Sequence, residues 1–292
     1  MTTSRVERWR EQGELVEAGG HRIFVREVAG DGPALLLLHG FPSSSYDWQD
    51  MLAELPAGQR VLAFDFLGFG LSDKPRRHDY SLFEQSDIAE ELVGRYLTGP
   101  VQVVAHDMGT SVATELMSRD IERKLGFELA GVLLFNGSVI VERASLTAGQ
   151  KMLRSPIGPL FARLSNKRVF SQQFGGLFSP SHPIDPDELD DQWALLTRAG
   201  GHHIAHRTIS YVGERTRHAE RWHGAVRDWT GDLQLAWGML DPVATPNVLE
   251  GLRELRPHAP VTVLPDLGHY PQLEQPATMA GLVAARLTRA EA

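Results

Sequence analysis

The chain has 292 residues, of which 42% are hydrophobic and 23% are charged, and its formal net charge is −8. This composition is typical of a globular protein, and the acidic balance argues against a nucleic-acid partner. The absence of cysteine excludes disulfides and thiolate metal sites. The N-terminus lacks the apolar core of a signal peptide, and no apolar run approaches the ~20 residues of a membrane span. We therefore expect a cytoplasmic protein with no membrane span.

The first part of the chain alternates between short apolar runs and helical patterns. Strands are predicted at residues 21–27, 33–38 and 60–64, and a Gly-rich loop over residues 65–73 follows the third strand. Helices are predicted at residues 43–55 and from Ser81 to Leu97, where Ser81-Leu-Phe-Glu84 has the spacing of a capping box. Strands that alternate with helices indicate an α/β fold with a mostly parallel sheet.

The next stretch, residues 101–111, has the pattern of a nucleophile elbow. A run of β-formers leads into Ala105-His-Asp-Met-Gly109, and a helical pattern follows at once. Small residues two positions before and after the centre allow the strand end and the helix start to approach closely. The central residue is Asp107 rather than serine, and a carboxylate there can attack an alkyl carbon and form an ester with the protein. The alternative is an ordinary turn in which Asp107 caps the helix.

The strand–helix rhythm stops after another predicted strand, residues 129–135. Residues 138–229 show helical patterns, several prolines and most of the histidines. The rhythm resumes with strands at 233–237 and 261–264 and helices at 248–255 and 277–287. We therefore predict a core domain of residues 1–137 and 230–292, interrupted by a helical cap of residues 138–229, because an insertion this long is typical of a functional lid.

Three titratable residues lie at predicted strand ends: Asp107, Asp241 and His269. Because ligands bind beyond the carboxyl ends of parallel strands, these residues are expected to converge. Their order along the chain is nucleophile, acid, histidine, which is the α/β-hydrolase order. The simpler alternatives are a turn-forming Asp241-Pro and a surface histidine at 269.

The chemistry of these residues suggests distinct roles. Asp107 would form an alkyl-enzyme ester, and His269 would activate the water that hydrolyses it. Asp241 would hold the imidazole in the required tautomer. The backbone N–H groups of Phe41 and Met108 would form the oxyanion hole.

The remaining polar residues and motifs give weaker indications of function. His106, beside the nucleophile, is a candidate contact of the substrate, and holding the site in shape is favoured over proton transfer. His39 is expected to brace its loop. The His202-His203-x-x-His206 pattern lacks a carboxylate that would complete a metal site, and Gly68-Phe-Gly70 lacks dinucleotide spacing. We therefore expect neither a metal nor a cofactor.

Several segments together resemble a known family. His39-Gly-Phe-Pro42, the Asp107 elbow, Gly238-x-x-Asp241 and Gly268-His269 look like the α/β-hydrolase group of epoxide hydrolases and haloalkane dehalogenases. Within that group, segments such as residues 64–75 and 269–274 are most similar to the mesoderm-specific transcript family. The similarity extends over nearly the whole chain and implies the α/β-hydrolase fold, a helical cap and Asp-based hydrolysis. It does not imply a substrate.

Departures from the group narrow the choice. Haloalkane dehalogenases usually carry halide-binding Trp and Asn side chains where this chain has Met108 and Phe41, and neither of these side chains can donate a hydrogen bond. Epoxide hydrolases polarise the epoxide oxygen with cap tyrosines, and the insertion has one, Tyr211, which could equally be a core aromatic. A second hydrogen-bond donor to the epoxide oxygen would have to be another cap residue, either His182 or Trp193.

Three hypotheses remain. The first is an epoxide hydrolase-like enzyme acting with water on a small to medium apolar molecule. The second is a haloalkane dehalogenase or another hydrolase with an Asp nucleophile. The third is a non-catalytic relative that binds a ligand. The sequence is compatible with a monomer or a homodimer.

Overall fold

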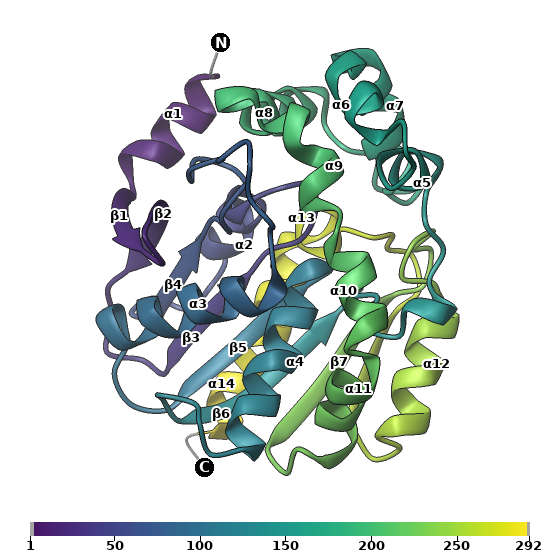
Figure 1. Ribbon diagram of the computed structural model, residues 1–292. Helices are drawn as coiled ribbons and strands as arrows, with labels where there is room; N and C mark the ends of the chain where they lie inside the picture. Colours follow the sequence, from purple (N-terminus) through teal and green to yellow (C-terminus); the bar gives the residue numbers. More distant parts are fainter. Residues whose placement is uncertain (1–2, 291–292) are drawn as a thin grey trace.

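The apolar runs of the sequence form the strands of one sheet. The computed structural model describes residues 3–290, and within them eight strands are ordered β1-β2-β4-β3-β5-β6-β7-β8 (Figure 1). The strands are β1 (Glu14–Ala18), β2 (His21–Val28), β3 (Ala34–Leu38), β4 (Arg60–Phe64), β5 (Val101–His106), β6 (Leu129–Phe135), β7 (Asp232–Gly238) and β8 (Val261–Leu264). β2 pairs antiparallel with both of its neighbours, β1 and β4. The remaining strands, in the spatial order β4-β3-β5-β6-β7-β8, pair in parallel. This confirms the predicted α/β fold with a mostly parallel sheet.

The helices occupy the connections between strands. They are α1 (Ser4–Glu11), α2 (Gln49–Ala53), α3 (Leu82–Tyr96), α4 (Met108–Ile121), α5 (Ala148–Leu153), α6 (Gly158–Leu164), α7 (Lys167–Gly175), α8 (Pro186–Thr197), α9 (Ala205–Thr208), α10 (Tyr211–Arg217), α11 (Ala219–Asp228), α12 (Pro246–Leu255), α13 (Pro271–Glu274) and α14 (Pro276–Ala290), with short 3₁₀ turns at Ser45–Trp48, Val141–Arg143 and Arg198–Ile204. In the part of the chain that the structure describes, no helix has the length and apolar character needed to cross a membrane.

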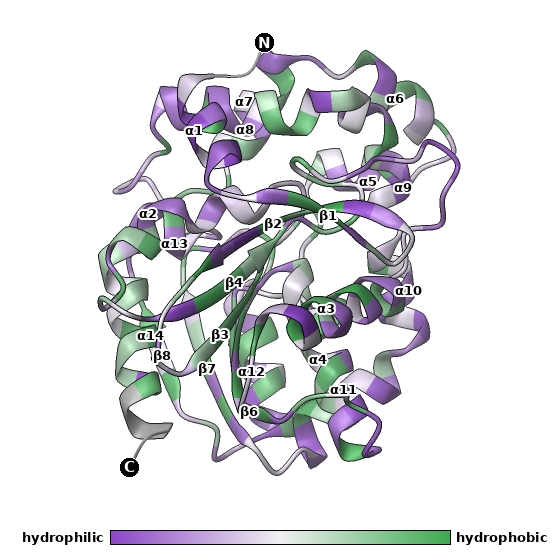
Figure 2. Cartoon of the chain, turned by 90° about the vertical axis from the view of Figure 1, so that its left-hand side faces the viewer, coloured by the Kyte–Doolittle hydropathy of each residue, from purple (hydrophilic) through white to green (hydrophobic). Residues whose placement is uncertain are grey.

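Both faces of the sheet are covered, which explains why its central strands are apolar throughout. Along β3, Leu36 and Leu38 belong to one hydrophobic core, whereas Leu35 and Leu37 belong to a second core on the opposite face. Helices α3, α4, α11 and α12 adjoin one another on the first face, and α2 and α14 pack together on the second. Figure 2 shows the green, apolar strands inside this envelope. A strand buried on both sides cannot alternate between apolar and polar residues.

Helices and 3₁₀ turns alone fill the chain between β6 and β7. The first of them, α5 to α8, lie beyond the carboxyl ends of the parallel strands, and α10 and α11 return along α4 (Figure 1). We call residues 138–229 the insertion.

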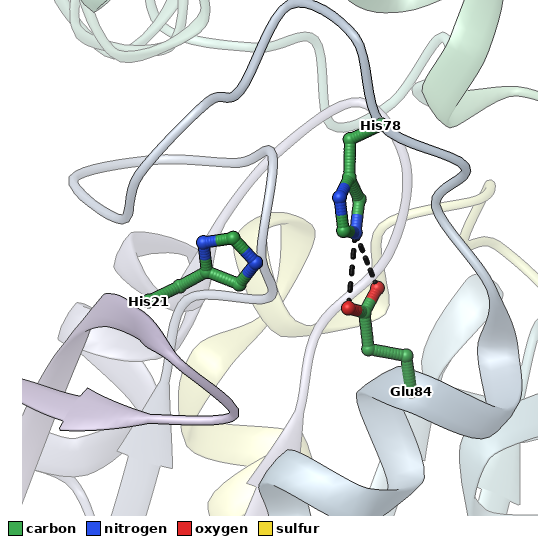
Figure 3. Close-up of side chains that lie close together, drawn as sticks. All are labelled: His21, His78 and Glu84. Atoms are coloured by element: carbon green, nitrogen blue, oxygen red, sulfur yellow. Dashed lines mark hydrogen bonds and ion pairs between the residues drawn. The ribbon is translucent and has the colours of Figure 1, made fainter.

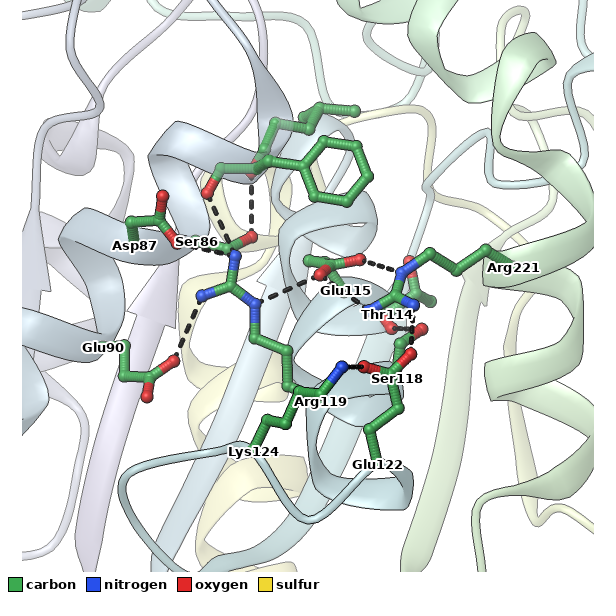
Figure 4. Close-up of polar contacts among 12 residues, drawn as sticks. Ser86, Asp87, Glu90, Thr114, Glu115, Ser118, Arg119, Glu122, Lys124 and Arg221 are labelled. Carbon is green, nitrogen blue, oxygen red and sulfur yellow. Dashed lines mark hydrogen bonds and ion pairs between the residues drawn. The ribbon is translucent and has the colours of Figure 1, made fainter.

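A buried carboxylate fastens the last helix of the insertion to the core. Glu115 of α4 is 1% exposed and accepts hydrogen bonds from Arg119 and from Arg221 (Figure 4). It also accepts one from the indole N–H of Trp222. Arg221 also pairs with Glu122 at the end of α4. Because Glu115 lies two turns beyond Asp107 on the same helix, this cluster sets the position of α11 relative to the elbow.

Two elements differ from the sequence-based expectation at the N-terminus. α1 and β1 were not predicted, although Val6 and Trp9, three positions apart, are the buried face of α1. Apolar and polar residues alternate only weakly along β1, and the strand is largely exposed because it lies at the edge of the sheet and pairs on one side only.

The predicted helix at residues 43–55 is shorter and begins with a 3₁₀ turn. The predicted capping box is also wrong in part. Ser81 caps α3 through Phe83 N–H, but Glu84 pairs with His78. The N–H of Leu82, the first residue of α3, donates a hydrogen bond to Glu214 of α10.

The Glu115 cluster gives a stability prediction. We expect Glu115→Gln to lower the free energy of unfolding by about 2 kcal/mol, because Arg119 and Arg221 each lose one of the carboxylates that they pair with and the buried side chain keeps only neutral hydrogen bonds. Urea unfolding followed by circular dichroism measures this change. Glu250→Gln, which removes an exposed ion pair with Arg253, is the matched control and should unfold like the wild type. Equal stability of the two variants would contradict the role assigned to Glu115.

Candidate active site

The turn between β5 and α4 places Asp107 in a strained backbone conformation. Its φ is 42° and its ψ is −109°, outside the regions that non-glycine residues usually adopt. The side chain makes no capping hydrogen bond to α4. The interpretation of Asp107 as an ordinary helix cap is therefore wrong, and the carboxylate is free to face the insertion.

Glycines make room for this turn. A Cβ atom on Gly109 would lie 2.4 Å from the carbonyl oxygen of Leu38, and one on Gly40 would lie 2.7 Å from the Cβ of Asp107. These contacts explain the small residues of the elbow pattern, because the β3 loop and the start of α4 touch at this point.

The carboxylate of Asp107 is held by one backbone donor. The N–H of Phe41 donates to Oδ2 at 2.9 Å, and the residue is 1% exposed. Met108 provides the first N–H of α4, a group with no acceptor inside the helix. Oδ2 thus occupies one arm of the expected oxyanion hole, and Oδ1 remains the more available oxygen.

A buried arginine that the sequence did not single out supports the elbow. Arg215 of α10 is 1% exposed and donates to the carbonyl oxygen of Asp107 at 2.7 Å and to Ser111 Oγ at 2.6 Å. Its guanidinium lies 4.0 Å from Oδ1 of Asp107 and 4.6 Å from the ring centroid of Tyr211. No motif marks this residue, because its role depends on where α10 packs.

Asp241 and His269 are bonded to each other. Nδ1 of His269 lies 2.7 Å from Oδ2 of Asp241, and His269 is 2% exposed, so the surface-histidine alternative is wrong. Oδ1 of Asp241 accepts the N–H groups of Val243 and Ala244, which shows that the same residue also shapes the turn.

Asn136 at the end of β6 is a further residue that the sequence did not single out. Its side-chain N–H donates to Oδ2 of Asp241 at 2.8 Å, and its Oδ1 accepts Gly238 N–H. Asn136 has a φ of 44°, and this conformation aims its amide at the Asp241 loop. An Asn-Gly pair after a strand was the available signal, but it is common in any turn.

The charges around His269 set its proton affinity. Burial by itself lowers the pKa of His269, but the adjacent carboxylate of Asp241, aided by Asp107, outweighs burial and raises the pKa above its ordinary value. Asp107 is therefore close enough to His269 to act on it electrostatically. With Nδ1 bonded to Asp241, Nε2 is the nitrogen left to exchange a proton.

His106 and His39 lie beneath the site. His106 is fully buried, stacks on Phe135 at 5.0 Å and pairs its Nε2 with the carbonyl oxygen of His269 at 2.7 Å. Burial lowers the pKa of His106 well below its usual value, so it is neutral. His39 accepts Phe66 N–H at 2.9 Å, and burial lowers its pKa to about 4. His39 braces its loop, as the sequence suggested.

The other candidate residues are dispersed. Tyr211 is 2% exposed, and its ring centroid lies 5.8 Å from that of Phe41, beside the Asp107 site. Trp193 on α8 packs against Phe170, and His182 is bonded to Gln275 at 2.8 Å. None of Tyr211, Trp193 and His182 is among the described residues that line the cavity between the core and the insertion.

A cavity with a volume of about 80 Å³ lies between the core and the insertion. It connects Phe41 and His269 to the inner faces of α5, α6 and α7, and its wall is largely aromatic and aliphatic. Polar groups on the wall include His202, whose Nδ1 is buried and has no hydrogen-bond partner among the described residues. Burial lowers the pKa of His202, so its ring is neutral. In the sequence, the His202-His203-x-x-His206 pattern was considered only as a metal-binding site.

One group of described side chains has donor atoms close enough for a metal ion: His21, His78 and Glu84, whose donor atoms lie within 4.8 Å of one another (Figure 3). His78 Nε2 already pairs with Glu84 at 2.7 Å. The group joins β2, the loop before α3 and α3 itself, and Asp107 is not part of it. The 202–206 histidines do not form such a group.

The Asp241–His269 contact gives a titration prediction. We expect the NMR pKa of His269 to lie above 6.5 in the wild type and below 6.5 in Asp241→Asn, because the amide offers no charge to offset burial. Asp266→Asn removes an exposed carboxylate nearby in the chain and should leave the value unchanged. An identical pKa in all three proteins would rule out electrostatic control by Asp241.

Known proteins share this architecture. A family profile described as "Alpha/beta hydrolase family" matches residues 35–282. The chain is 54% identical over 280 residues to "Putative hydrolase LipZ" of Mycobacterium tuberculosis, covering 96% of this chain and 97% of that protein. It is 37% identical over 280 residues to the mesoderm-specific transcript homolog protein of Homo sapiens, covering 92% and 83%.

Among solved structures, haloalkane dehalogenase DbeA from Bradyrhizobium elkani superposes with a TM-score of 0.79 over 96% of this chain and 98% of that one, at 21% identity. At this identity the likeness shows the fold alone. The profile and the two sequence relatives confirm both the expected fold and the resemblance to mesoderm-specific transcript proteins. The chain belongs to the alpha/beta hydrolase family.

Proposed function

We propose that this alpha/beta hydrolase uses Asp107 as a nucleophile that forms an alkyl-enzyme ester, which a water activated by His269 then hydrolyses. The observation that carries the proposal is the hydrogen bond from Phe41 N–H to Oδ2 of Asp107 at 2.9 Å. It holds the carboxylate by one oxygen in the oxyanion hole and leaves Oδ1 for attack. A serine hydrolase would instead reserve that donor for a substrate oxygen.

In the first step, Oδ1 of Asp107 attacks an electrophilic carbon. A new carbon–oxygen bond forms while the bond from that carbon to the leaving group breaks, and the leaving group keeps the electron pair. For an epoxide, the leaving group is the ring oxygen, which needs a proton as it opens. Burial and the nearby charge of Asp107 raise the pKa of Tyr211, so its hydroxyl is protonated and can donate to that oxygen.

In the second step, His269 removes a proton from water, and the resulting hydroxide attacks Cγ of Asp107. Negative charge then develops on Oδ2, which already lies 2.9 Å from the Phe41 amide. Met108 N–H is the second donor of this oxyanion hole. Collapse of the tetrahedral intermediate expels the product oxygen, which takes back the proton from His269, and Asp241 stabilises the protonated ring until then. The new Asp107 carboxyl group gives its proton to the Tyr211 phenolate, so both residues return to their starting states.

The surroundings favour an epoxide over a haloalkane. The side chains of Phe41 and Met108 adjoin the carboxylate, and neither can donate a hydrogen bond to a departing halide. Tyr211 lies on the same side, packed against Phe41, and supplies one donor. The aromatic and aliphatic cavity wall suits a small to medium apolar substrate. Residues 138–229 then act as a cap over the core of residues 1–137 and 230–292.

Arg215 would be a positioning residue in this mechanism. Its bonds to the Asp107 carbonyl oxygen and to Ser111 hold the elbow from the insertion side. Dehalogenation and ligand binding without catalysis are the other outcomes of a substrate panel: halide release would identify the first, and inactivity on every electrophile the second.

Trapping the intermediate tests the nucleophile. With an epoxide that the wild type turns over, His269→Ala should accumulate an alkyl adduct on the peptide that contains Asp107, because loss of the base slows the second step more than the first. Mass spectrometry of the digested protein measures the adduct. His258→Ala, which alters an exposed histidine, should turn over normally.

Isotope labelling can contradict the assignment of Asp107 as the nucleophile. One turnover of the wild type in heavy-oxygen water should place the label in the Asp107 peptide. If the label appears only in the product, Asp107 acts as a general base and the proposed covalent step is wrong.

A second test concerns Tyr211. We expect Tyr211→Phe to lower epoxide turnover by about a hundredfold, as for loss of one donor to a developing oxyanion, while the melting temperature changes little. Steady-state kinetics give the effect. Tyr96→Phe removes a hydroxyl that bonds Glu14 at the surface and should keep full activity. Unchanged turnover in Tyr211→Phe would assign leaving-group protonation to another residue.

A further inference from the structure

The outer side of the insertion carries an unusual concentration of exposed apolar side chains. Of the eight large hydrophobic residues exposed in the described chain, four fall within residues 152–164. The three most exposed are Leu164 at 67%, Leu160 at 58% and Ile157 at 53%. Single exposed apolar residues are normal, but a cluster on one short segment marks a surface that binds something.

Helix α6 is apolar on both sides. Phe161 and Ala162 face the cavity between the core and the insertion, whereas Leu160 and Leu164, one turn apart, face outward. A helix whose opposite sides are both apolar is expected to be covered on both of them. α6 lies at the outer edge of the molecule, far from the sheet (Figure 1). Within residues 3–290, nothing covers the outer side of α6 at Leu160 and Leu164.

The same region is basic, although the protein as a whole is acidic. Residues 144–184 contain five lysine or arginine residues and no aspartate or glutamate, in a chain of net charge −8. Lys167 pairs with Asp190. The other four, which make no ion pair with any described residue, are Lys151, Arg154, Arg163 and Arg168, and all four are exposed.

A groove beside α6 gathers further arginines. Its volume is about 540 Å³, and Pro159 and Arg163 of α6 form one wall. Arg76 and Arg77 come from the loop before α3, and Arg207 comes from α9. No carboxylate lines the groove, and none of the four guanidinium groups has an ion-pair partner in the described part of the chain. Like charges gathered without counter-charges favour a bound anion, and guanidinium groups suit phosphate.

We propose that this face, which we call the α6 face, docks on a lipid surface that contains anionic phospholipid. Ile157, Leu160 and Leu164 enter the boundary between headgroups and acyl chains, and the arginine groove receives a headgroup phosphate. Apolar residues flanked by basic ones are the pattern of proteins that lie on a membrane without spanning it. A second copy of the chain fits less well, because symmetric pairing of this face would bring its arginines together.

Vesicle co-sedimentation of the whole protein tests the apolar part. We expect binding to vesicles of phosphatidylcholine with about 30 mol% phosphatidylserine, and at least about tenfold weaker binding to phosphatidylcholine alone. Leu160→Glu with Leu164→Glu should lower binding at least about tenfold. The matched control is Leu15→Glu with Val263→Glu, two exposed apolar residues on β1 and β8, and it should bind like the wild type.

The arginines are tested separately. Arg77→Gln with Arg163→Gln should weaken binding to the anionic vesicles about twenty-fivefold, at about fivefold for each charge, and added salt should reduce this difference. Arg8→Gln with Arg123→Gln removes two exposed arginines that have no ion-pair partner among the described residues, and it should leave binding unchanged. Melting temperatures establish that each variant is folded.

Other outcomes would overturn the proposal. Equal binding to neutral and anionic vesicles would remove the role of the arginine groove. No vesicle binding, together with a wild-type dimer that Leu160→Glu with Leu164→Glu converts to a monomer in light scattering, would make the α6 face a contact between copies. Stabilisation by millimolar inorganic phosphate without vesicle binding would make the groove a site for free phosphate. None of these readouts depends on the proposed reaction.

Discussion

The left-handed backbone at Asp107 is the constraint on which the rest of the site depends. A φ of 42° on a residue with a Cβ atom costs on the order of 1–3 kcal/mol, and it persists only where the surroundings enforce it. The glycines at positions 40 and 109 give the turn its space. The Phe41 amide and Arg215 then fix the carboxylate and the carbonyl group of the same residue. The position of the Asp107 carboxylate is thus set by packing within the protein.

The insertion does more than cover the site, because it contributes to the geometry of the elbow. Arg215 on α10 bonds the Asp107 peptide, and the neighbouring helix α11 is fastened to α4 through the buried Glu115. Tyr211 begins α10, one turn before Arg215. Asp107, Tyr211 and Arg215 therefore depend on the packing of α4, α10 and α11, so that a shift of the insertion would move all three together.

Charge is distributed unevenly over the molecule. The acidic excess lies in the core and in the rest of the insertion, whereas every Lys, Arg, Asp or Glu residue within 144–184 is a lysine or an arginine. The bulk value of −8 therefore hides a surface of opposite sign. That surface belongs to the helices whose inner sides line the cavity. An apolar cavity below an apolar and basic outer face is a consistent arrangement for a protein that meets hydrophobic molecules at a lipid boundary.

The sequence by itself determined the fold class, the elbow and the order of Asp107, Asp241 and His269, because buried parallel strands are continuous apolar runs and their polar ends are local signals. Short-range patterns could not reveal Asn136 or Arg215, since each acts through a contact with a residue about a hundred positions away. For the same reason Glu84 has the spacing of a capping-box residue but pairs with His78, and Glu214 of α10 accepts the N–H of Leu82 at the start of α3. Only the tertiary structure decided these partners, because a polar side chain bonds whichever group packing brings within reach.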